Sequence, residues 1–375
     1  MPVAVGTAFL LLVACAREQA TVVVGLAWPE EPPYARMVAQ AVIDSTASPG
    51  DPRILVVPFH DVVDQDSSTL QSAVDQALQL AASPDVVAVV GHPSSTETVL
   101  AAPIYAEAGI PLLVPTATTR RLADAGPLVF ALAPNDSVEG EFIAEFAQSR
   151  LQARSALVFY AVDDYGTGLA AGVSSAFARR GVTVIDRVPV RLDHQCQPFS
   201  ATNPYEDQVE ASFRKGVPDV VIVAGRRWEV GCIARAVDMR AAGTQVIAGD
   251  GAAPADSVLT ETAGLALDSL YLVVFWVADD EVLRPAGFAS LFQRIAGRAA
   301  RPEDALVHDA ILLIVTAVRE VGANRASVRA YLEGLGRSRP PYAGVTGAIT
   351  FQPGAHRPLH MMRIRSGQVQ RAEAR

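Results

Sequence analysis

Short hydrophobic runs alternate with amphipathic segments along most of this chain. The runs are rich in β-branched residues and include TVVVGLA at 21–27, DVVAVVG at 85–91 and LYLVVFW at 270–276. Patterns with helical periodicity lie between them, such as STLQSAVDQALQLAA at 68–82 and GTGLAAGVSSAFARRG at 166–181. Continuous apolar strands that alternate with amphipathic helices are typical of parallel sheets covered on both faces. The sequence therefore predicts an α/β fold.

Length and charge narrow the class of protein. A chain of 375 residues is too long for one ordinary core and suits two lobes of roughly 150 to 200 residues each. The net charge of −9 argues against a nucleic-acid partner, because such a partner needs a basic surface.

The N-terminal segment has the character of an export signal. Residues 3–14 are apolar but shorter than the roughly 20 residues that a membrane-spanning helix needs. Leu12 to Cys15 resembles a bacterial lipobox, in which the cysteine becomes the lipidated first residue of the mature chain. An ordinary signal peptide cut near Ala20 is the alternative, and no Lys or Arg precedes Cys15. We expect residues 1–20 to be a leader and Cys15 to be the lipidation site.

Two further cysteines remain after the leader. Cys196 and Cys232 form an even pair in a chain that is expected to reach an oxidising compartment, which favours a disulfide over two separate thiols. Only His194 lies near them, so the set is a poor zinc site. We expect no metal and no cofactor.

Ligand-binding groups are expected where strands meet helices, because open α/β sheets bind ligands beyond the carboxyl ends of their strands. Two such junctions, GHPSST at 91–96 and PTATT at 115–119, are rich in hydroxyl groups. Ser and Thr often do no more than cap a helix. Two such junctions on neighbouring strands would nevertheless form a polar cup for an anion.

Two later junctions carry different chemistry. DDYGTG at 163–168 offers Tyr165, which has an apolar face and a polar tip. GDG at 249–251 holds the Asp250 carboxylate between two glycines, where backbone can approach a ligand closely. An ordinary turn is the alternative interpretation of this last segment.

The serial order of these segments resembles a known family. GHPSSTETVLAAPIYAEAGIPLLVPTATT is followed by VFYAVDDYGTGLA, DVVIVAGRRWEVGCIARAVDMRAAG, AGDG and finally GAITFQPGAHRPLHMMRIRSG. The chain after Cys15 is similar to the leucine/isoleucine/valine-binding proteins of bacterial ABC importers, which are type I periplasmic binding proteins. The resemblance implies two Rossmann-like lobes with parallel sheets, joined by three crossovers.

We expect the crossovers near Ala133–Asp136, Gly249–Ala252 and Thr350–Pro353. The N-terminal lobe would then comprise 21–133 plus 252–350, and the C-terminal lobe 134–251 plus 351–375.

The resemblance also implies roles for individual residues. Ser95 and Thr118 correspond to the hydroxyls that bind a ligand's α-carboxylate. The Ala117 carbonyl and the Asp250 carboxylate correspond to the groups that hold the α-ammonium. Tyr165 corresponds to the tyrosine that closes over the ligand from the second lobe.

An aromatic side chain near the first strand completes the implied pocket. Ungapped alignment of VGLAWPEEPPYA at 24–35 places Tyr34 there, with Trp28 as a second candidate. An amino-acid zwitterion needs anion donors and one anionic acceptor in a cleft that excludes water, and the implied set supplies both.

Arg226 departs from the family pattern. The family usually has an aromatic residue near the ligand where this chain has Arg226, Arg227 and Trp228. Arg226 could pair with Asp250 and disturb the ammonium site, reach a polar group on a longer ligand, or lie solvated at the lobe edge. We therefore expect an amino acid or a small carboxylate as ligand, and an amino acid if Arg226 leaves Asp250 free.

The predicted function is capture of this ligand for an ABC permease in the membrane. The protein would lie in the periplasm or on the outer face of a bacterial membrane, held there by a lipid anchor. A sensor or envelope protein without a transporter is one alternative. An enzyme is another, but the chain has no Gly-x-Ser-x-Gly elbow, no phosphate loop and no spaced His cluster.

Overall fold

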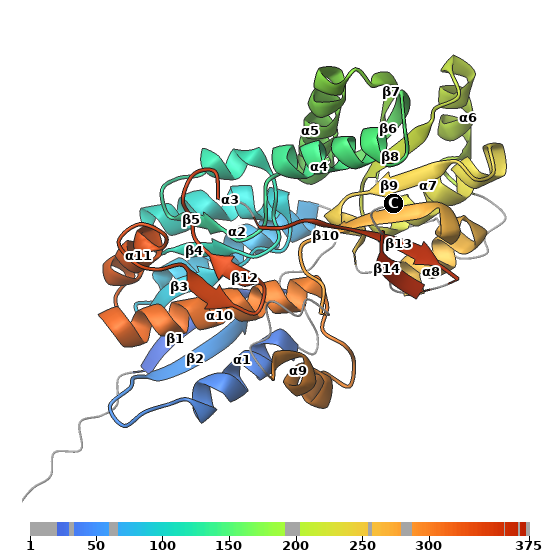
Figure 1. Cartoon of the computed structure of the whole chain (residues 1–375). Helices are drawn as coiled ribbons and strands as arrows, with labels where there is room; N and C mark the ends of the chain where they lie inside the picture. The colour runs from blue at the N-terminus through green and yellow to red at the C-terminus, as the bar shows by residue number, and fades with distance from the viewer. Residues whose placement is uncertain are drawn as a thin grey trace, which may run out of the picture.

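Two α/β lobes lie side by side in the computed structural model of the chain (Figure 1). The structure describes residues 21–29, 34–59, 67–191, 203–253, 257–278, 287–355, 357–366 and 368–372. A five-stranded sheet forms the centre of the first lobe, and a seven-stranded sheet forms the centre of the second. The predicted α/β fold with two lobes is confirmed.

The sheet of the first lobe is parallel throughout and has the order β2-β1-β3-β4-β5. Its strands are β1 (Thr21–Ala27), β2 (Arg53–Phe59), β3 (Val86–Val90), β4 (Leu112–Val114) and β5 (Val129–Ala131). One face is covered by α1 (Tyr34–Ser45), α10 (Pro302–Val321) and α11 (Arg325–Gly334), and the other by α2 (Ser67–Ala82) and α3 (Ser95–Glu107).

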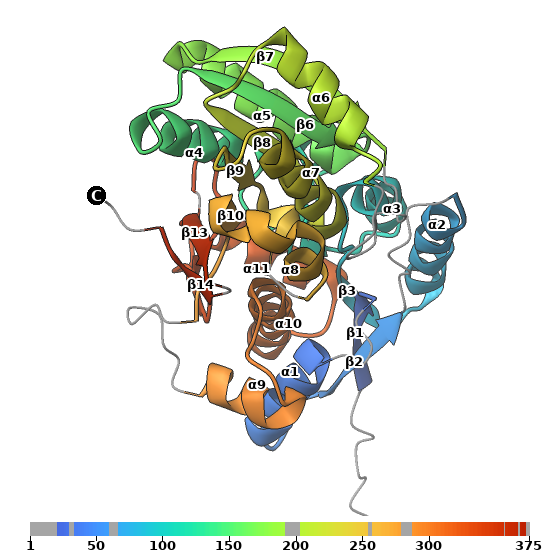
Figure 2. The same cartoon turned by 90° about the vertical axis from the view of Figure 1, so that its right-hand side faces the viewer.

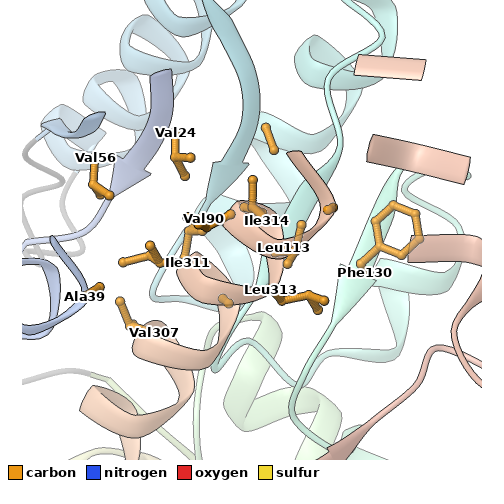
Figure 3. Packing of buried hydrophobic residues seen from close by; sticks show 14 of the residues in the cluster. Val24, Ala39, Val56, Val90, Leu113, Phe130, Val307, Ile311, Leu313 and Ile314 are labelled. Atoms are coloured by element: carbon orange, nitrogen blue, oxygen red, sulfur yellow. The ribbon is translucent and has the colours of Figure 1, made fainter. Parts of the chain in front are cut away.

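Alternation along the strands explains why both faces are apolar. Val90 and Leu113 point toward α10, where they pack with Ile311 and Ile314 (Figure 3). The adjacent residues, among them Val89, point toward α2 and α3 on the opposite face. The continuous apolar runs in the sequence are therefore strands buried on two sides.

Three smaller elements complete the first lobe. The helix α9 (Phe288–Ala296) packs beside α1, and the short helix η1 (Arg120–Ala123) follows the β4 junction. Strands β11 (Tyr342–Gly344) and β12 (Gly347–Ile349) pair with each other.

The sheet of the second lobe has the order β14-β13-β10-β9-β8-β6-β7. Five strands run parallel, and β13 and β14 are added in antiparallel fashion at one edge. The strands are β6 (Ser155–Ala161), β7 (Thr183–Val190), β8 (Val220–Ala224), β9 (Gln245–Ala248), β10 (Leu270–Val274), β13 (His360–Arg365) and β14 (Gln368–Arg371).

Helices again cover both faces of this sheet. The helices α4 (Asp136–Ser149) and α5 (Asp164–Arg180) pack on one face. On the other face lie α6 (Glu206–Lys215), α7 (Arg227–Arg240) and α8 (Ser257–Ala263), and Figure 2 shows α7 and α8 turned toward the viewer. Two short helices, η2 (Asp250–Ala252) and η3 (Gly264–Ser269), flank α8.

One predicted boundary is wrong. We expected the chain to return to the first lobe at Gly249–Ala252, but β10 pairs in parallel with β9, so residues through Val274 belong to the second lobe. The chain enters the first lobe at Phe275, which packs in that lobe's core. The hydrophobic run at 270–276 predicts a strand but does not indicate which of the two sheets it joins.

Within the described part of the chain, no helix combines the length and the apolar character that a membrane crossing requires. The same residues contain no group of three or more His, Cys, Asp or Glu side chains arranged to hold a metal ion.

Candidate functional site

A cavity of about 180 Å³ lies between the two lobes. The first lobe contributes the junctions after β3 and β4 and the start of α10. The second lobe contributes the starts of α5 and α7 and the turn η2. Five of the residues that the sequence singled out line this cavity: Ser95, Ala117, Tyr165, Arg226 and Asp250.

Hydroxyl groups line the wall that the first lobe supplies. Ser94 caps α3, where its side chain accepts a hydrogen bond from the Glu97 N–H, and Ser95 follows as the first residue of the helix. The Ser95 hydroxyl accepts from the Thr119 N–H at 3.3 Å, so its own hydrogen can be donated to a ligand. With the N-terminus of α3 beside it, this wall suits an anionic group.

Thr116 joins the two hydroxyl-rich junctions. Its hydroxyl donates to the Pro93 carbonyl at 2.9 Å, and both residues line the cavity. From the sequence, the ligand contacts of this segment were expected at Ala117 and Thr118 rather than at Thr116.

Thr118 does not line the cavity between the lobes. Its carbonyl accepts from the Asp136 N–H at 2.9 Å, which holds Thr118 against the connection between β5 and α4. The residue lines a neighbouring cavity of about 290 Å³, formed with residues 132–135 and 349–355. The expected pairing of Ser95 with Thr118 in one site is therefore absent from this arrangement.

The turn after β9 forms the centre of the opposite wall. The Asp250 N–H donates to Glu139 Oε1 at 2.8 Å, and the Gly251 N–H donates to the Tyr165 hydroxyl oxygen at 2.9 Å. A Cβ at Gly251 would lie 2.6 Å from Tyr165 Cε1, and one at Gly249 would lie 2.6 Å from the Tyr165 hydroxyl. Both glycines are required because this turn packs directly on the tyrosine.

Arg226 pairs with Asp163 rather than with Asp250. Its Nη1 lies 2.6 Å from Asp163 Oδ2, while Asp163 Oδ1 accepts the Gly166 N–H at 2.6 Å and thereby caps α5. The Arg226 N–H also donates to Glu229 Oε2 at 2.8 Å, which fixes the start of α7. Among the described residues, the Asp250 carboxylate is therefore left to face the cavity without an ion-pair partner.

Burial changes the acidity of the carboxyl groups on this side. It raises the pKa of Asp250 to about 6, although hydrogen bonds from Glu139 and Tyr165 and the charge of Arg226 act in the opposite direction. Burial also raises the pKa of Asp136 to about 7. The pKa of Glu139 rises well above its usual value because of burial and the nearby charge of Asp250.

The start of α10 closes another side of the cavity and was not predicted from the sequence. Glu303 and Leu306 line the cavity together with Phe275 and Arg227. Burial raises the pKa of Glu303 to about 7, although the charges of Arg301 and Arg227 lower it. The Pro302 helix start was the available signal, but a proline at the first turn of a helix is common and indicates no ligand.

The aromatic residues near the first strand lie outside the cavity. Tyr34 begins α1 and packs edge-on against Phe292, with 6.4 Å between the ring centroids, while the Arg298 guanidinium lies 5.5 Å from the Tyr34 ring centre. Trp28 is buried in the core of the first lobe. The assignment of Tyr34 depended on an alignment without gaps, and the structure does not bring that side chain to the cavity.

Cys232 lies in α7, fully buried, and is disulfide-bonded. Its backbone carbonyl accepts from Asn203 Nδ2 at 2.7 Å. Cys196 and Cys15 lie outside the described residues, so the Cys196–Cys232 pairing and the lipidation of Cys15 stay predictions.

Two α/β lobes that enclose a polar cavity beyond the carboxyl ends of their strands define a two-lobed binding protein. This chain belongs to the periplasmic binding protein family, which matches residues 59–372. The resemblance inferred from the sequence is thereby confirmed.

Two curated relatives match part of the chain. An amino acid binding protein from Pseudomonas aeruginosa is 29% identical over 173 residues, which is 44% of this chain and 45% of the relative. A Leu/Ile/Val/Thr-binding protein from Salmonella typhimurium is 27% identical over 151 residues, which is 39% of each chain. The matched segments therefore span less than half of these relatives.

Solved structures share the fold over nearly the whole chain. A leucine-binding protein from Thermotoga maritima has a TM-score of 0.78 at 20% identity and covers 94% of this chain and 98% of its own. A solute-binding protein from R. palustris in complex with benzoate has a TM-score of 0.75 at 18% identity and covers 94% and 96%. At these identities the likeness establishes the fold.

Proposed function

We propose that this protein binds an amino acid as a zwitterion in the cavity between its lobes. The observation that carries the proposal is the position of the Ser95 hydroxyl and the Asp250 carboxylate on opposite walls of one cavity. The Ser95 hydroxyl at the start of α3 would donate to the ligand carboxylate, and Asp250 would accept from the ligand ammonium. Charge-assisted hydrogen bonds of this kind are about twice as strong as neutral ones and fix the ligand's orientation.

An amine-free carboxylate is the second candidate, and it is favoured by the two arginines that line the cavity. Arg226, however, is already paired with Asp163 at 2.6 Å. The charge of Arg227 acts on Glu303, which lines the same cavity. An amine-free acid would leave Asp250 facing the cavity as an unmatched buried carboxylate, which is costly. The balance of charges therefore favours the zwitterion.

Delivery of the ligand to an ABC permease is part of the proposal. Membership of the periplasmic binding protein family and the amino-acid ligands named for the two curated relatives support it. The signal-like segment at residues 1–20 supports a location outside the cytoplasm, with Cys15 as the lipid anchor. A sensor of the same fold without a transporter would use the same cavity.

A thermal-shift screen tests the proposed ligand class. The panel contains the twenty common amino acids and a set of amine-free acids that includes benzoate and 4-hydroxybenzoate. A ligand at 100 times its Kd stabilises the folded state by about 2.7 kcal/mol, which such a screen detects. We expect the largest shift with an amino acid. Shifts with amine-free acids alone would contradict the proposal, and consumption of the ligand would indicate an enzyme.

A further inference from the structure

A second carboxyl group lies directly behind Asp250. Glu139 stands in the first turn of α4, is fully buried and does not line the cavity. Its Oε1 accepts the Asp250 N–H at 2.8 Å. Its other oxygen, Oε2, is buried and has no donor among the described residues when the group is ionised, and the same is true of Asp250 Oδ1. The two side chains are in hydrogen-bond contact with each other.

Two carboxyl groups can form a hydrogen bond only if one of them carries a proton, because ionised carboxylates are acceptors alone. A single proton shared by Glu139 and Asp250 would supply the donor that this buried pair otherwise lacks. Two ionised groups would instead repel each other in a buried place. The burial of both groups and their closeness therefore favour one shared proton.

The surroundings determine which group keeps that proton. Arg226 lies at the start of α7, and its charge acts on Asp250, whose carboxylate also contacts the Tyr165 hydroxyl. Glu139 is deeper and faces the negative charges of Asp250 and Asp136, and these raise its pKa further beyond the effect of burial. These surroundings favour a proton on Glu139 and an ionised Asp250 at neutral pH.

Other charged groups nearby do not reverse this assignment. Asp163 and Asp164, at the start of α5, are close enough to act on Asp136, and both are acidic. Arg226 is engaged by Asp163, and Arg121 by Asp164, in ion pairs of 2.6 Å each. The acidic character of the cluster favours a neutral Glu139.

We propose that Glu139 is a positioning residue for the ligand ammonium: as a neutral acid it donates its proton to Asp250 and holds the ionised carboxylate toward the cavity. This inference rests on the proposed function, because it assumes that Asp250 receives an ammonium group. Glu139 itself does not touch the ligand and acts through Asp250.

Carbon-13 NMR of the ligand-free protein tests where the proton resides. The protein is labelled at the glutamate side-chain carboxyl carbons, and the Glu139 resonance is identified as the one missing from E139Q. We expect this resonance to keep the chemical shift of a protonated carboxyl group from pH 5 to pH 7. An ordinary titration with a midpoint near 4.5 would overturn the proposal, whatever the ligand proves to be.

Two substitutions test the positioning role, with a mixture of the twenty common amino acids as the probe in thermal-shift measurements. In E139Q the amide oxygen still accepts from the Asp250 N–H and the amide nitrogen still donates to Asp250, so we expect the wild-type ligand-induced shift. In E139A both contacts are lost, and we expect most of the shift to disappear. E141Q is the matched control, because Glu141 lies on the same helix but is exposed and paired with Arg179 and Arg180.

Each outcome decides one point. Loss of the shift in E139Q would mean that Glu139 acts as a charge, which overturns the proposal, and an unchanged shift in both variants would exclude a positioning role. If E139A does not fold, the ligand-induced shift of E139Q and the NMR titration still test whether Glu139 acts as a neutral acid. A wild-type protein that does not respond to the mixture would refute the proposed function, while the NMR result would still settle the location of the proton.

Discussion

The two walls of the cavity obtain their polarity in different ways. The wall built from the β3 and β4 junctions offers hydroxyls and the start of α3, whose dipoles do not titrate. The wall built around η2 offers Asp250, with Glu139 and Asp136 behind it, and the charge of these groups depends on bound protons. We expect the anion-binding end of the site to be insensitive to pH and the cation-binding end to be sensitive.

Removal of the Asp250 charge should have the largest effect. Asp250→Asn leaves the ligand ammonium buried without an anionic partner, and breaking such a pair costs about 3–5 kcal/mol. We expect the affinity for the amino acid found in the screen to fall by a factor on the order of 10² to 10⁴ in calorimetry. Asp124→Asn, at an exposed position of the first lobe, is the control and should bind as the wild type does. Comparable affinity in both variants would exclude Asp250 from the site.

The protein should become less stable as the pH rises, because buried carboxyl groups behind η2 lose their protons. Burial raises the pKa of Asp136 from 3.8 to about 7, so the folded state holds a proton that the unfolded state has released. The stability linked to this group is complete below about pH 4 and is lost as the pH rises through about 7, by up to about 4 kcal/mol. Asp136→Asn should flatten the dependence between about pH 4 and pH 7, as measured by urea unfolding. A slope equal to that of the wild type would show that Asp136 is ionised throughout.

Substitutions in the wall built from the β3 and β4 junctions should reduce the ligand affinity less than Asp250→Asn does. Of Ser95 and Thr118, only Ser95 should matter. Ser95→Ala removes a donor to the ligand carboxylate, and we expect a loss of about 1–3 kcal/mol of binding. Thr118→Ala provides a matched comparison, because Thr118 lines the neighbouring cavity and should change the affinity by less than about twofold. Equal losses at both positions in calorimetry would restore Thr118 to the binding site.

Among the charged residues that line the cavity, Arg226 should have only a weak effect on amino-acid binding. Its guanidinium is paired with Asp163, so Arg226→Ala is expected to change the affinity for an amino acid by no more than about threefold. A carboxylate without an amine would depend on this cation, and its binding would collapse in the same variant. Calorimetry with both ligand classes therefore separates the two candidates.

The sequence predicted the strand-to-helix junctions well, because the end of an apolar run followed by Ser, Gly or Asp is a local signal. Ser95, Tyr165 and Asp250 come from three such junctions and line one cavity. Glu303, at the start of α10, was not predicted because α10 follows another helix, α9, and not a strand. It therefore does not belong to a strand-to-helix junction. Glu139 was missed for a related reason, since its partner lies 111 residues away and only folding brings the two together.

Two other predictions were wrong for a different reason: the cavity that Thr118 lines, and the lobe to which strand β10 belongs. Thr116 and Thr118 stand two residues apart in one hydroxyl-rich segment, and only the folded structure shows that Thr116 lines the cavity between the lobes while Thr118 lines the neighbouring one. Strand β10 could have joined either sheet, because an apolar run contains no information about its pairing partner. Both errors concern long-range contacts, which local patterns do not specify.

A crystal structure with the amino acid from the screen bound tests the central claim most directly. We predict that the ligand lies between the lobes, with its carboxylate within hydrogen-bond distance of the Ser95 hydroxyl and its ammonium within hydrogen-bond distance of the Asp250 carboxylate. A ligand in the opposite orientation, or one bound in the neighbouring cavity beside Thr118, would contradict the assignment of the two walls.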